Sequence, residues 1–362
     1  MRVCFLTLYP EEAASPRYRV GQYLPYLREH GVQCDVMAAL PGGLYRYLKA
    51  HHGRLSVMAY HGAEFTRRVA QMARTSAYDV VFVQKAILSI YLRGATGLVN
   101  LSGRPLVYDI DDAVHLKPPN PMPRLMRWLE EPDQGKRLFQ RADLVLAGNR
   151  WIAQEAEAQG GRSVVFPTVV DTARFTPVKE RAQGYRVGWI GSPSTTPALR
   201  EAGHALGDLT DMELVLVGAD RVSAPWRSAQ IVPWRQEEEV EVIQTFDVGL
   251  MPLAKDAWSR GKCALKALQY MACGVPCVAT PYGAVEDIIE DGRNGLFADT
   301  PDAWREAIER LRDDAFRAEL GAAASVTVEE RYSLETSAPR LLALLEEVSK
   351  SHTQPISTER RA

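Results

Sequence analysis

Residues 246–296, FDVGLMPLAKDAWSRGKCALKALQYMACGVPCVATPYGAVEDIIEDGRNGL, read as one strand–loop–helix–strand unit. The apolar run at 247–251 is typical of a buried parallel strand. After a polar loop we expect a helix over residues 262–272, ended by Gly274 as a left-handed cap. A second buried strand is predicted at 275–279. This stretch indicates a parallel α/β sheet.

The expected helix carries a basic stripe at its start. At about 100° per residue, Lys262, Lys266 and Gln269 fall on one narrow face, and Arg260 lies just before them. Two lysines four residues apart repel each other, and the helix dipole disfavours cations in the first turns. A bound polyanion would reverse both penalties, so the stripe predicts a phosphate site. The alternative is a solvated basic face.

Length and composition fit an enzyme of about two domains. The chain has 362 residues, 46% of them hydrophobic, and a formal net charge of -2, which argues against disorder and against generic nucleic-acid binding. Five cysteines without a CxxC pair indicate reduced thiols in a cytoplasmic protein. Neither a signal peptide nor an apolar run long enough to span a membrane is expected.

Strand and helix patterns alternate along the chain, which predicts a doubly wound parallel sheet in each of two Rossmann-like domains. A proline-containing connection at 167–184 interrupts this rhythm and places the boundary near residue 175. We expect domains at 1–175 and 176–350, and a disordered tail at 351–362. Strands are predicted at 3–7, 32–39, 79–83, 106–110, 144–147, 164–166, 186–190, 214–217, 248–250 and 275–279.

A hydroxyl-rich loop follows the first strand of the second domain, where ligands bind in such folds. Gly191 allows close approach of a ligand to the backbone. Three hydroxyl side chains can donate to phosphate oxygens or cap the next helix: Ser192, Ser194 and Thr195.

An acidic group follows the strand predicted at 106–110. Asp109, Asp111, Asp112 and His115 could coordinate a metal, act as a base or orient sugar hydroxyls. Metal is the weakest option, because nothing else nearby completes a ligand set. The alternative is a helix N-cap with a surface histidine, and Asp112 is the expected cap of the next helix.

Residues 246–296 resemble the donor-binding core of glycosyltransferase family 4, the glycosyl transferases group 1 enzymes of the GT-B fold. The matching elements are FDVGLMPL, LQYMACGVPCVAT and EDIIEDGRNGL. Residues 79–83, 107–112, 142–147 and 167–175 follow the family's order, so the resemblance covers about residues 1–345.

The resemblance implies two Rossmann-like domains that face each other across a cleft, with the final helices packing back on the first domain. The first domain would bind an acceptor and the second a sugar nucleotide, with retention at the anomeric carbon and without a metal ion or other cofactor. Catalytic roles fall on Asp111, Lys262 and Lys266. The implied donor-binding residues are Gly191, Ser192, Ser194, Thr195, Arg260, Lys262, Lys266, Gln269 and Glu286, and the acceptor-binding residues are Arg17, Tyr18, Arg19, Asp109, Asp112 and His115.

The sequence departs from the family's pattern at several of these positions. The family's glutamate pair falls on Gly261 and Gln269, and its usual histidine falls on Asp111. Its glycine–arginine pair is Gly191–Ser192, and residues 15–19 replace its glycine-rich first loop. Two other readings therefore stay open: an inactive donor-binding homologue that supports a partner transferase, and a sugar-nucleotide epimerase on the same fold.

The acceptor is the least defined partner. A glycan, a lipid-linked molecule or a small molecule would all fit, and no nucleic acid is expected. Residues 117–139 combine arginines with Trp128 and leucines. This segment predicts either an acceptor-cleft loop or peripheral contact with the inner face of the cytoplasmic membrane.

Overall fold

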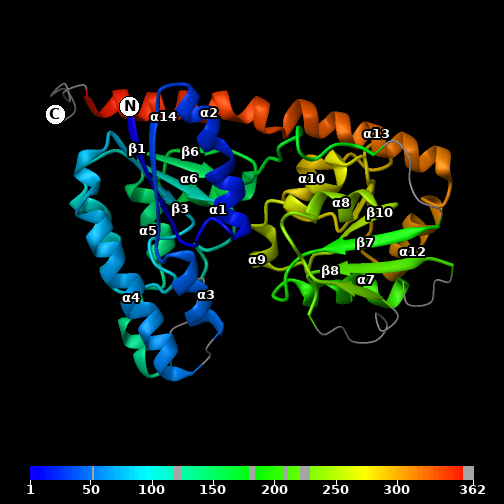
Figure 1. Cartoon of the computed structure of the whole chain (residues 1–362), viewed down its shortest axis with the longest axis horizontal. Coiled ribbons are helices and arrows are strands. Elements are labelled where there is room, and N and C mark those ends of the chain that lie inside the picture. Colours follow the sequence, from blue (N-terminus) through cyan, green and yellow to red (C-terminus); the bar gives the residue numbers. More distant parts are fainter. Residues whose placement is uncertain (51–52, 118–123, 179–183, 207–210, 221–228, 354–362) are drawn as a thin grey trace. The chain divides into compact units, whose positions relative to one another are not determined.

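The computed structural model describes residues 1–50, 53–117, 124–178, 184–206, 211–220 and 229–353 (Figure 1). The chain divides into two compact units: Met1–Pro167 with Ala338–Ala362, and Thr168–Ser337. The first crossing between units thus falls before the predicted boundary near residue 175, and the C-terminal helix returns to the first unit. The tail predicted at 351–362 lies outside the described residues from 354 onward.

The first unit contains a six-stranded sheet with the order β2-β1-β3-β4-β5-β6. Every pairing in it is parallel. All residues of three inner strands, β3, β4 and β5, are buried, as expected for strands covered on both faces. The strands are β1 (Arg2–Thr7), β2 (Gln33–Ala38), β3 (Val80–Gln84), β4 (Leu106–Ile110), β5 (Leu144–Ala147) and β6 (Ser163–Val165).

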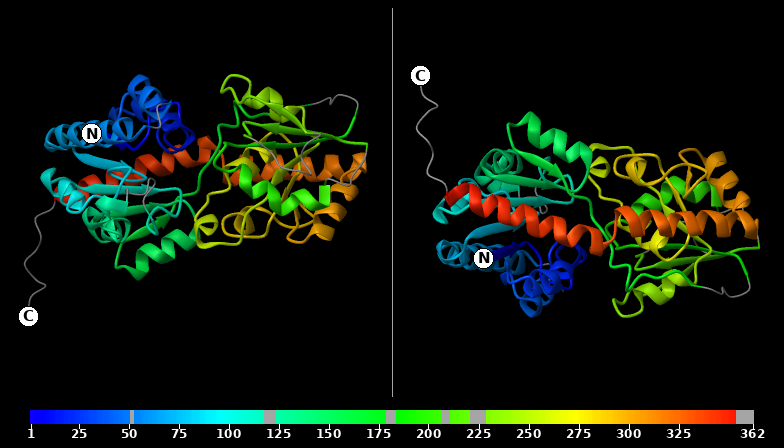
Figure 2. Two further views of the ribbon diagram at one scale, coloured as in Figure 1. Left: turned by 90° about the horizontal axis from the view of Figure 1, so that it is seen from below. Right: turned by 90° about the horizontal axis from the view of Figure 1, so that it is seen from above.

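Helices cover both faces of this sheet (Figure 2). The long hairpin of α3 and α4 follows β2, and α14 ends the described chain. The α-helices are α1 (Ala14–Arg19), α2 (Leu24–Glu29), α3 (Gly42–Ala50), α4 (Arg54–Met72), α5 (Gln134–Arg141), α6 (Arg150–Ala158) and α14 (Leu334–Thr353). The 3-10 turns are η1 (Gly21–Tyr23), η2 (Thr75–Ala77), η3 (Ala95–Leu101) and η4 (Arg124–Leu129).

The second unit repeats this architecture with the order β12-β11-β10-β7-β8-β9, again parallel throughout. Its strands are β7 (Arg186–Ile190), β8 (Glu213–Val217), β9 (Gln230–Val232), β10 (Val248–Met251), β11 (Cys277–Ala279) and β12 (Leu296–Phe297). Its helices are η5 (Thr196–Leu199), α7 (Arg200–Leu206), α8 (Glu239–Gln244), α9 (Ala257–Arg260), α10 (Leu265–Ala272), α11 (Val285–Ile288), α12 (Pro301–Arg310) and α13 (Asp314–Arg331).

The core of the second unit forms between its sheet and α7, α12 and α13. Trp189 and Trp304 are buried there with Leu250 and Ile308. Glycines let large rings lie directly on the strands: a Cβ on Gly188 would meet the Phe246 ring at 2.2 Å. The apolar runs that predict strands are therefore the residues that fill this core.

Most predicted strands match within two residues, and two edge strands were missed. β9 and β12 are only three and two residues long, so they carry too short a pattern to be recognised. The helix expected over 262–272 begins only at Leu265, because Ala264 adopts a left-handed conformation with φ 52°. Gly274 has φ 66°, which confirms its predicted role as the end of that helix.

Candidate functional site

The donor-side residues gather at the carboxyl end of β7 and the start of α10. The Lys266 side chain leaves the first turn of α10 and places its Nζ 4.2 Å from the centre of the Trp189 ring. The same Nζ donates to the Thr195 Oγ1 at 3.3 Å. The predicted lysine stripe and the predicted hydroxyl loop are thus neighbours in space, although about seventy residues separate them in sequence.

The environment of Lys266 disfavours its charge. Burial, followed by the nearby positive charge of Lys262, lowers the pKa of Lys266 to about 7. Among the described residues, no carboxylate forms an ion pair with this ammonium group, whose hydrogen bond goes to Thr195. A half-buried cation on an aromatic ring, next to hydroxyl groups and a helix N-terminus, is suited to hold an anion.

Gly191 is required at this position by its surroundings. A Cβ there would lie 2.3 Å from the Trp189 ring and 2.8 Å from the Lys266 Nζ. The residues after it fold into a tight turn, in which the Ser192 N–H donates to Thr195 Oγ1 at 3.0 Å. Ser192 and Ser194 are exposed and their hydroxyl oxygens lie 2.9 Å apart. The turn therefore presents hydroxyl groups beside the ammonium group, as the loop composition predicts.

Lys262 does not belong to the helix on which the sequence pattern places it. It lies in the turn between α9 and α10, and it is near enough to Lys266 to lower that residue's pKa. The predicted single helical face is therefore wrong for Lys262, although the two cations do lie in one region. The cause is the left-handed Ala264, a backbone strain of the kind that gathers at functional sites.

The remaining donor-side residues differ in exposure. Arg260 is the last residue of α9, and its side chain is exposed. Gly283 packs against the Arg260 carbonyl, so the start of α11 lies close to the end of α9. Glu286 is exposed and accepts from the Gly283 N–H at 3.1 Å, as a helix-capping residue does. Gln269 is only 3% exposed. A contact between Gln269 and a ribose would require its side chain to be uncovered, so that role stays a prediction.

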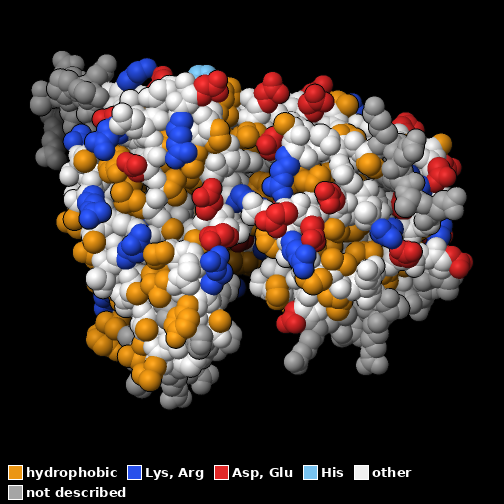
Figure 3. Space-filling view, viewed as in Figure 1, with side chains coloured by type: hydrophobic (Ala, Val, Ile, Leu, Met, Phe, Trp, Pro, Cys, Tyr) orange, Lys and Arg blue, Asp and Glu red, His pale blue; other side chains and the backbone are white. Residues whose placement is uncertain are grey.

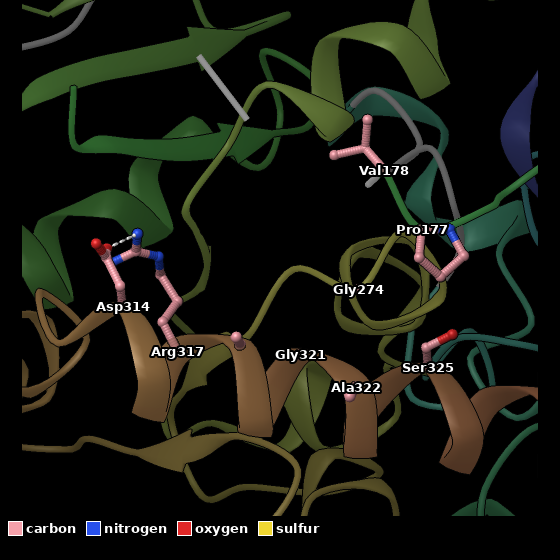
Figure 4. Close-up of a pocket in the computed structure, with 9 residues that line it drawn as sticks. Pro177, Val178, Gly274, Asp314, Arg317, Gly321, Ala322 and Ser325 are labelled. Carbon is pink, nitrogen blue, oxygen red and sulfur yellow. Dashed lines mark hydrogen bonds and ion pairs between the residues drawn. The ribbon is translucent and has the colours of Figure 1, made fainter. Parts of the chain in front are cut away.

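A separate cavity of about 290 Å³ lies at the opposite end of α10 (Figure 4). Pro177, Gly274 and residues of α13 line it. Its cation, Arg317, is paired with Asp314 and, at 3.4 Å, with Asp247. No residue of the predicted site lines this cavity. The positive charge of Arg317 is already compensated by the two carboxylates.

In the first unit, the acidic group after β4 surrounds a lysine. Lys85 directly follows β3, and its Nζ lies 3.0 Å from Asp112 Oδ2 and 3.6 Å from Asp111 Oδ1. Asp111 also accepts from the Ser15 hydroxyl, which accepts from the Gln84 amide at 2.6 Å. The start of α1, the end of β3 and the loop after β4 thus meet at the carboxyl edge of the sheet, where a doubly wound sheet binds ligands.

The charges of this cluster stabilise one another. Burial alone would lower the pKa of Lys85, but Asp111 and Asp112 raise it above its usual value. Burial would raise the pKa of Asp111, but Lys85, Arg19 and the Ser15 hydroxyl hold it below its usual value. Asp111 is therefore a carboxylate at neutral pH, able to accept a hydrogen bond from a ligand hydroxyl.

Lys85 is the main residue that the sequence argument missed. Its backbone is left-handed at φ 72°, fixed by its N–H donating to the Asp109 carbonyl at 2.7 Å and its carbonyl accepting from the Tyr108 hydroxyl at 3.0 Å. Such a conformation is strained for a lysine and is held only by its surroundings. Its place directly after a buried strand was the available signal, as it was for Asp111.

Asp109 and Arg19 form a buried ion pair, with 1% of each side chain exposed. Arg19 also donates to the Phe166 carbonyl at 2.9 Å. Burial raises the pKa of Asp109 to about 6, against the opposing effect of Arg19. Tyr18 is also buried, whereas Arg17 is partly exposed with its guanidinium group 4.8 Å from the Tyr18 ring centre. This burial favours positioning roles over direct contact with an acceptor for Arg19, Tyr18 and Asp109.

Two expectations about the residues after Asp111 are corrected. His115 is 1% exposed and packs against the rings of Phe139 and Trp151, so it is not a surface histidine. Burial, helped by Lys136, lowers the pKa of His115 to about 4. Asp112 caps no helix, because residues 112–117 form turns, and it binds Lys85 instead.

The described residues hold no cluster of three or more His, Cys, Asp or Glu side chains that could bind a metal ion. No described helix is both long enough and apolar enough to cross a bilayer. Of the segment predicted at 117–139, the described part includes Trp128, which is 70% exposed. Its role as an acceptor loop or membrane contact stays a prediction.

The architecture of both units is that of GT-B proteins. Anabaena HepE in complex with UDP and glucose matches 96% of this chain and 99% of its own, with a TM-score of 0.67 and 17% identity. Sucrose-phosphate synthase from Thermosynechococcus elongatus matches 97% of this chain and 100% of its own, with a TM-score of 0.70 and 15% identity. At these identities the likeness defines the fold class alone.

Sequence comparison then finds a family match within the second unit. Residues 187–314 match the family model described as "Glycosyl transferases group 1". The D-inositol 3-phosphate glycosyltransferase of Corynebacterium jeikeium is 31% identical over 221 residues, which are 51% of each chain. The matched segments span between 14% and 51% of the relatives' own lengths. Residues 187–314 of the second unit thus match the glycosyl transferases group 1 model, and the chain has a GT-B fold, which confirms the resemblance. Placement in family 4 stays a prediction.

Proposed function

We propose that the protein is a glycosyltransferase that moves a sugar from a nucleoside-diphosphate sugar to an acceptor hydroxyl. The observation that carries the proposal is the Lys266 ammonium group, held on Trp189 beside the hydroxyl turn at the start of α10. A diphosphate bound there would restore the full charge of Lys266 and accept from the loop hydroxyls. UDP is the proposed nucleotide, because the solved relative HepE binds it.

In this proposal the positive side chains stabilise the departing diphosphate. Negative charge grows on the leaving group as the glycosidic bond to the diphosphate breaks, and preorganised cations stabilise that charge. Lys266 and Lys262 would do this without a metal ion, with retention of the anomeric configuration. Arg260, Gln269 and Glu286 are proposed as further contacts to the nucleotide or sugar.

On the acceptor side, Asp111 is proposed to face the reacting sugar and the acceptor hydroxyl. Its depressed pKa suits it to accept a hydrogen bond from that hydroxyl or to offset positive charge on the sugar ring. Lys85 would hold it in place. The acceptor remains a hydroxyl-bearing glycan, lipid-linked molecule or small molecule. The five cysteines are free thiols, so a reducing, cytoplasmic setting is part of the proposal.

The test begins with a thermal-shift screen of nucleoside diphosphates and their sugars. A ligand at 100 times its dissociation constant stabilises by about 2.7 kcal/mol, so the preferred donor should be distinct. Transfer is then measured with that donor and a panel of hydroxyl acceptors, in excess chelator. We expect Lys266→Ala to lower turnover by about 10²–10³-fold. Asp111→Asn should lower turnover strongly while leaving donor binding almost unchanged.

Each alternative has its own outcome in this experiment. Donor binding without transfer to any acceptor would favour an inactive homologue, and release of an isomerised donor would favour an epimerase. Normal turnover in Lys266→Ala would remove the phosphate assignment. A requirement for added manganese or magnesium would overturn metal independence and make Asp109, Asp111 and Asp112 candidate ligands.

A further inference from the structure

Trp189 is a core residue of the second unit whose ring also contacts the Lys266 ammonium group. It lies on the inner strand β7, opposite Leu216 of β8, and it is fully buried. The Lys266 Nζ lies 4.2 Å from the centre of its ring. An aromatic face attracts a cation within about 6 Å of the ring centre. The ring therefore stabilises the charged form of Lys266, whereas burial of the same side chain destabilises that form.

The backbone of β7 and the helix α10 hold the ring and the ammonium group against each other. Helix α10 is tied to β7 by Tyr270, whose hydroxyl accepts from the Ile190 N–H at 2.9 Å. Lys266 and Tyr270 are four residues apart on α10, so they lie on the same face of the helix. At the end of β7, a Cβ on Gly191 would lie 2.3 Å from the indole and 2.8 Å from the Lys266 Nζ. The contact is thus fixed by the framework of the unit.

This contact takes the place of the carboxylate that pairs with other basic side chains of the unit. Lys255, for example, has its Nζ 2.9 Å from an Asp299 oxygen. Figure 3 shows acidic and basic side chains interspersed over one face of the molecule. Among the described residues, the Lys266 ammonium group instead contacts an aromatic ring and the Thr195 hydroxyl, and the charge that acts on it is that of Lys262, which repels it. The ring therefore orients the ammonium group while leaving its charge available to an anionic ligand.

The indole N–H of Trp189 supports a role for the ring beyond packing. This N–H is buried and donates to no atom of the described residues. An unpaired buried donor destabilises a fold, and a phenylalanine or an aliphatic side chain at this position would avoid that cost. Tryptophan is present nonetheless, and its face attracts cations more strongly than that of phenylalanine. The strength of the ring face under Lys266 is thus what distinguishes Trp189 from these alternatives.

We propose that Trp189 is a positioning residue for Lys266: its ring face holds the ammonium group at the hydroxyl turn and stabilises its charge where the donor diphosphate binds. The inference rests on the proposed function for the identity of the ligand, although not for the contact between ring and ammonium group. Trp189 would act only through Lys266. Its effect on donor affinity therefore follows the fraction of Lys266 that is charged, because the apparent affinity of a ligand falls with the fraction of the binding-competent form.

The first test is an NMR titration of Lys266 in the ligand-free chain, with lysines isotope-labelled at Cε. The Lys266 signal is assigned by its absence from Lys266→Met. Trp189→Met removes the ring but keeps an adaptable apolar side chain, so the pKa of Lys266 should fall from about 7 by about one. Trp189→Phe keeps a weaker ring face and should lower the pKa by less than half as much. Trp304→Phe, which changes another buried tryptophan of the same core, is the matched control and should leave the pKa unchanged.

UDP affinity then links the residue to the donor site. At a pH of about 7.5, a fall of about one in the pKa lowers the charged fraction of Lys266 by about tenfold. Trp189→Met should therefore bind UDP about tenfold more weakly, and it should regain affinity as the pH is lowered toward about 6. Trp304→Phe should bind UDP as the original chain does. Circular dichroism checks that each variant is folded, and if Trp189→Met does not fold, Trp189→Phe decides alone.

The outcomes separate this inference from the proposed function. The inference is overturned if the pKa of Lys266 is unchanged or raised when the ring is removed, or if Trp304→Phe lowers it equally. It is also overturned if the pKa falls as expected but UDP binds Trp189→Met and the original chain equally tightly. An original chain that does not bind UDP at all, with the expected fall of the pKa in the variants, would contradict the proposed function and still support the hold of Trp189 on Lys266.

Discussion

Lys266 is a residue whose ordinary chemistry has been altered by its neighbours. An exposed lysine has a pKa near 10.5, and burial beside Lys262 lowers that of Lys266 to about 7. From pH 7 to 10.5 the unfolded chain therefore binds more protons here than the folded chain does. The free energy of unfolding therefore rises with pH from 7 to 10.5. That gain is lost again as the pH falls from 10.5 to 7, the pKa of the folded state. The folded protein thus keeps a cation site that is costly until an anion occupies it.

This cost leads to a prediction about protons. At pH 8 most Lys266 is neutral. A bound diphosphate should raise its pKa, so that binding is accompanied by the uptake of about one proton. Calorimetry of UDP binding in buffers with different protonation enthalpies measures this uptake. Lys266→Met should abolish it, whereas Lys255→Met, which changes a lysine paired with Asp299 at 2.9 Å, should not. Equal uptake in both variants would contradict the assignment.

The residue scale also shows where sequence reasoning ended. The pattern predicted that Asp111 lies at a strand end, because a buried run precedes it. It could not predict that Lys85 compensates both Asp111 and Asp112, since Lys85 and Asp112 are 27 positions apart in sequence. Nor could it predict the burial of His115, whose ring is covered by Phe139 and Trp151.

Elements of this fold approach closely where glycine allows it. Helix α10 packs against α13 through Gly274 and Gly321, and a Cβ on Gly321 would lie 2.3 Å from the Gly274 carbonyl oxygen. Gly62 in α4 has no such neighbour within 4 Å. Close packing therefore requires glycine at position 321 but not at position 62. The sequence alone does not reveal this difference.

We expect the same substitution to have opposite effects at these two positions. Gly321→Ala should lower the free energy of unfolding by about 1–3 kcal/mol, because the added methyl group overpacks the contact. Gly62→Ala should raise it by about 0.5–1 kcal/mol, because alanine is the better helix former. Urea unfolding measures the free energy of unfolding of each variant. Hydrogen exchange then shows whether the change is located in α13 or in α4. A stabilised Gly321→Ala variant would show that α10 and α13 can separate at little cost.

At the scale of the whole molecule, the chain leaves its first unit and returns to it. Helix α14 begins in the second unit, and from Ala338 onward it belongs to the first. Ala338, Leu341, Leu345 and Val348 are buried along one side of it. Part of the first unit's core is thus supplied by the last described residues of the chain, far in sequence from its sheet.

Leu345→Ala tests this dependence. The side chain is fully buried, so its truncation should destabilise the first unit by about 2–5 kcal/mol. In hydrogen exchange, the strands β1 to β6 should lose protection while β7 to β12 keep theirs, and UDP should still protect the second unit. Leu101→Ala, at a 59% exposed position of the same unit, is the control and should change little. Equal loss of protection in both units would mean that they unfold together.

The sequence by itself determined the fold class and most of the strands. Apolar runs of four to six residues can satisfy their backbone only in a covered parallel sheet, so their places follow from local pattern. It also predicted which loops would carry a ligand site, because ligand-binding residues of doubly wound sheets follow strand ends. The hydroxyls after β7 were predicted by that rule, and the lysines of the 246–296 stretch by their helical spacing.

Only the tertiary structure decided which of those residues contact one another and which of them are charged. Ser15 reaches Asp111 across 96 residues, and Lys266 reaches Thr195 across 71. Burial then set the charges: it lowered the pKa of Lys266 and covered Arg19, Asp109 and His115. Contacts and desolvation depend on neighbours brought together by packing, and no local pattern of residues contains them.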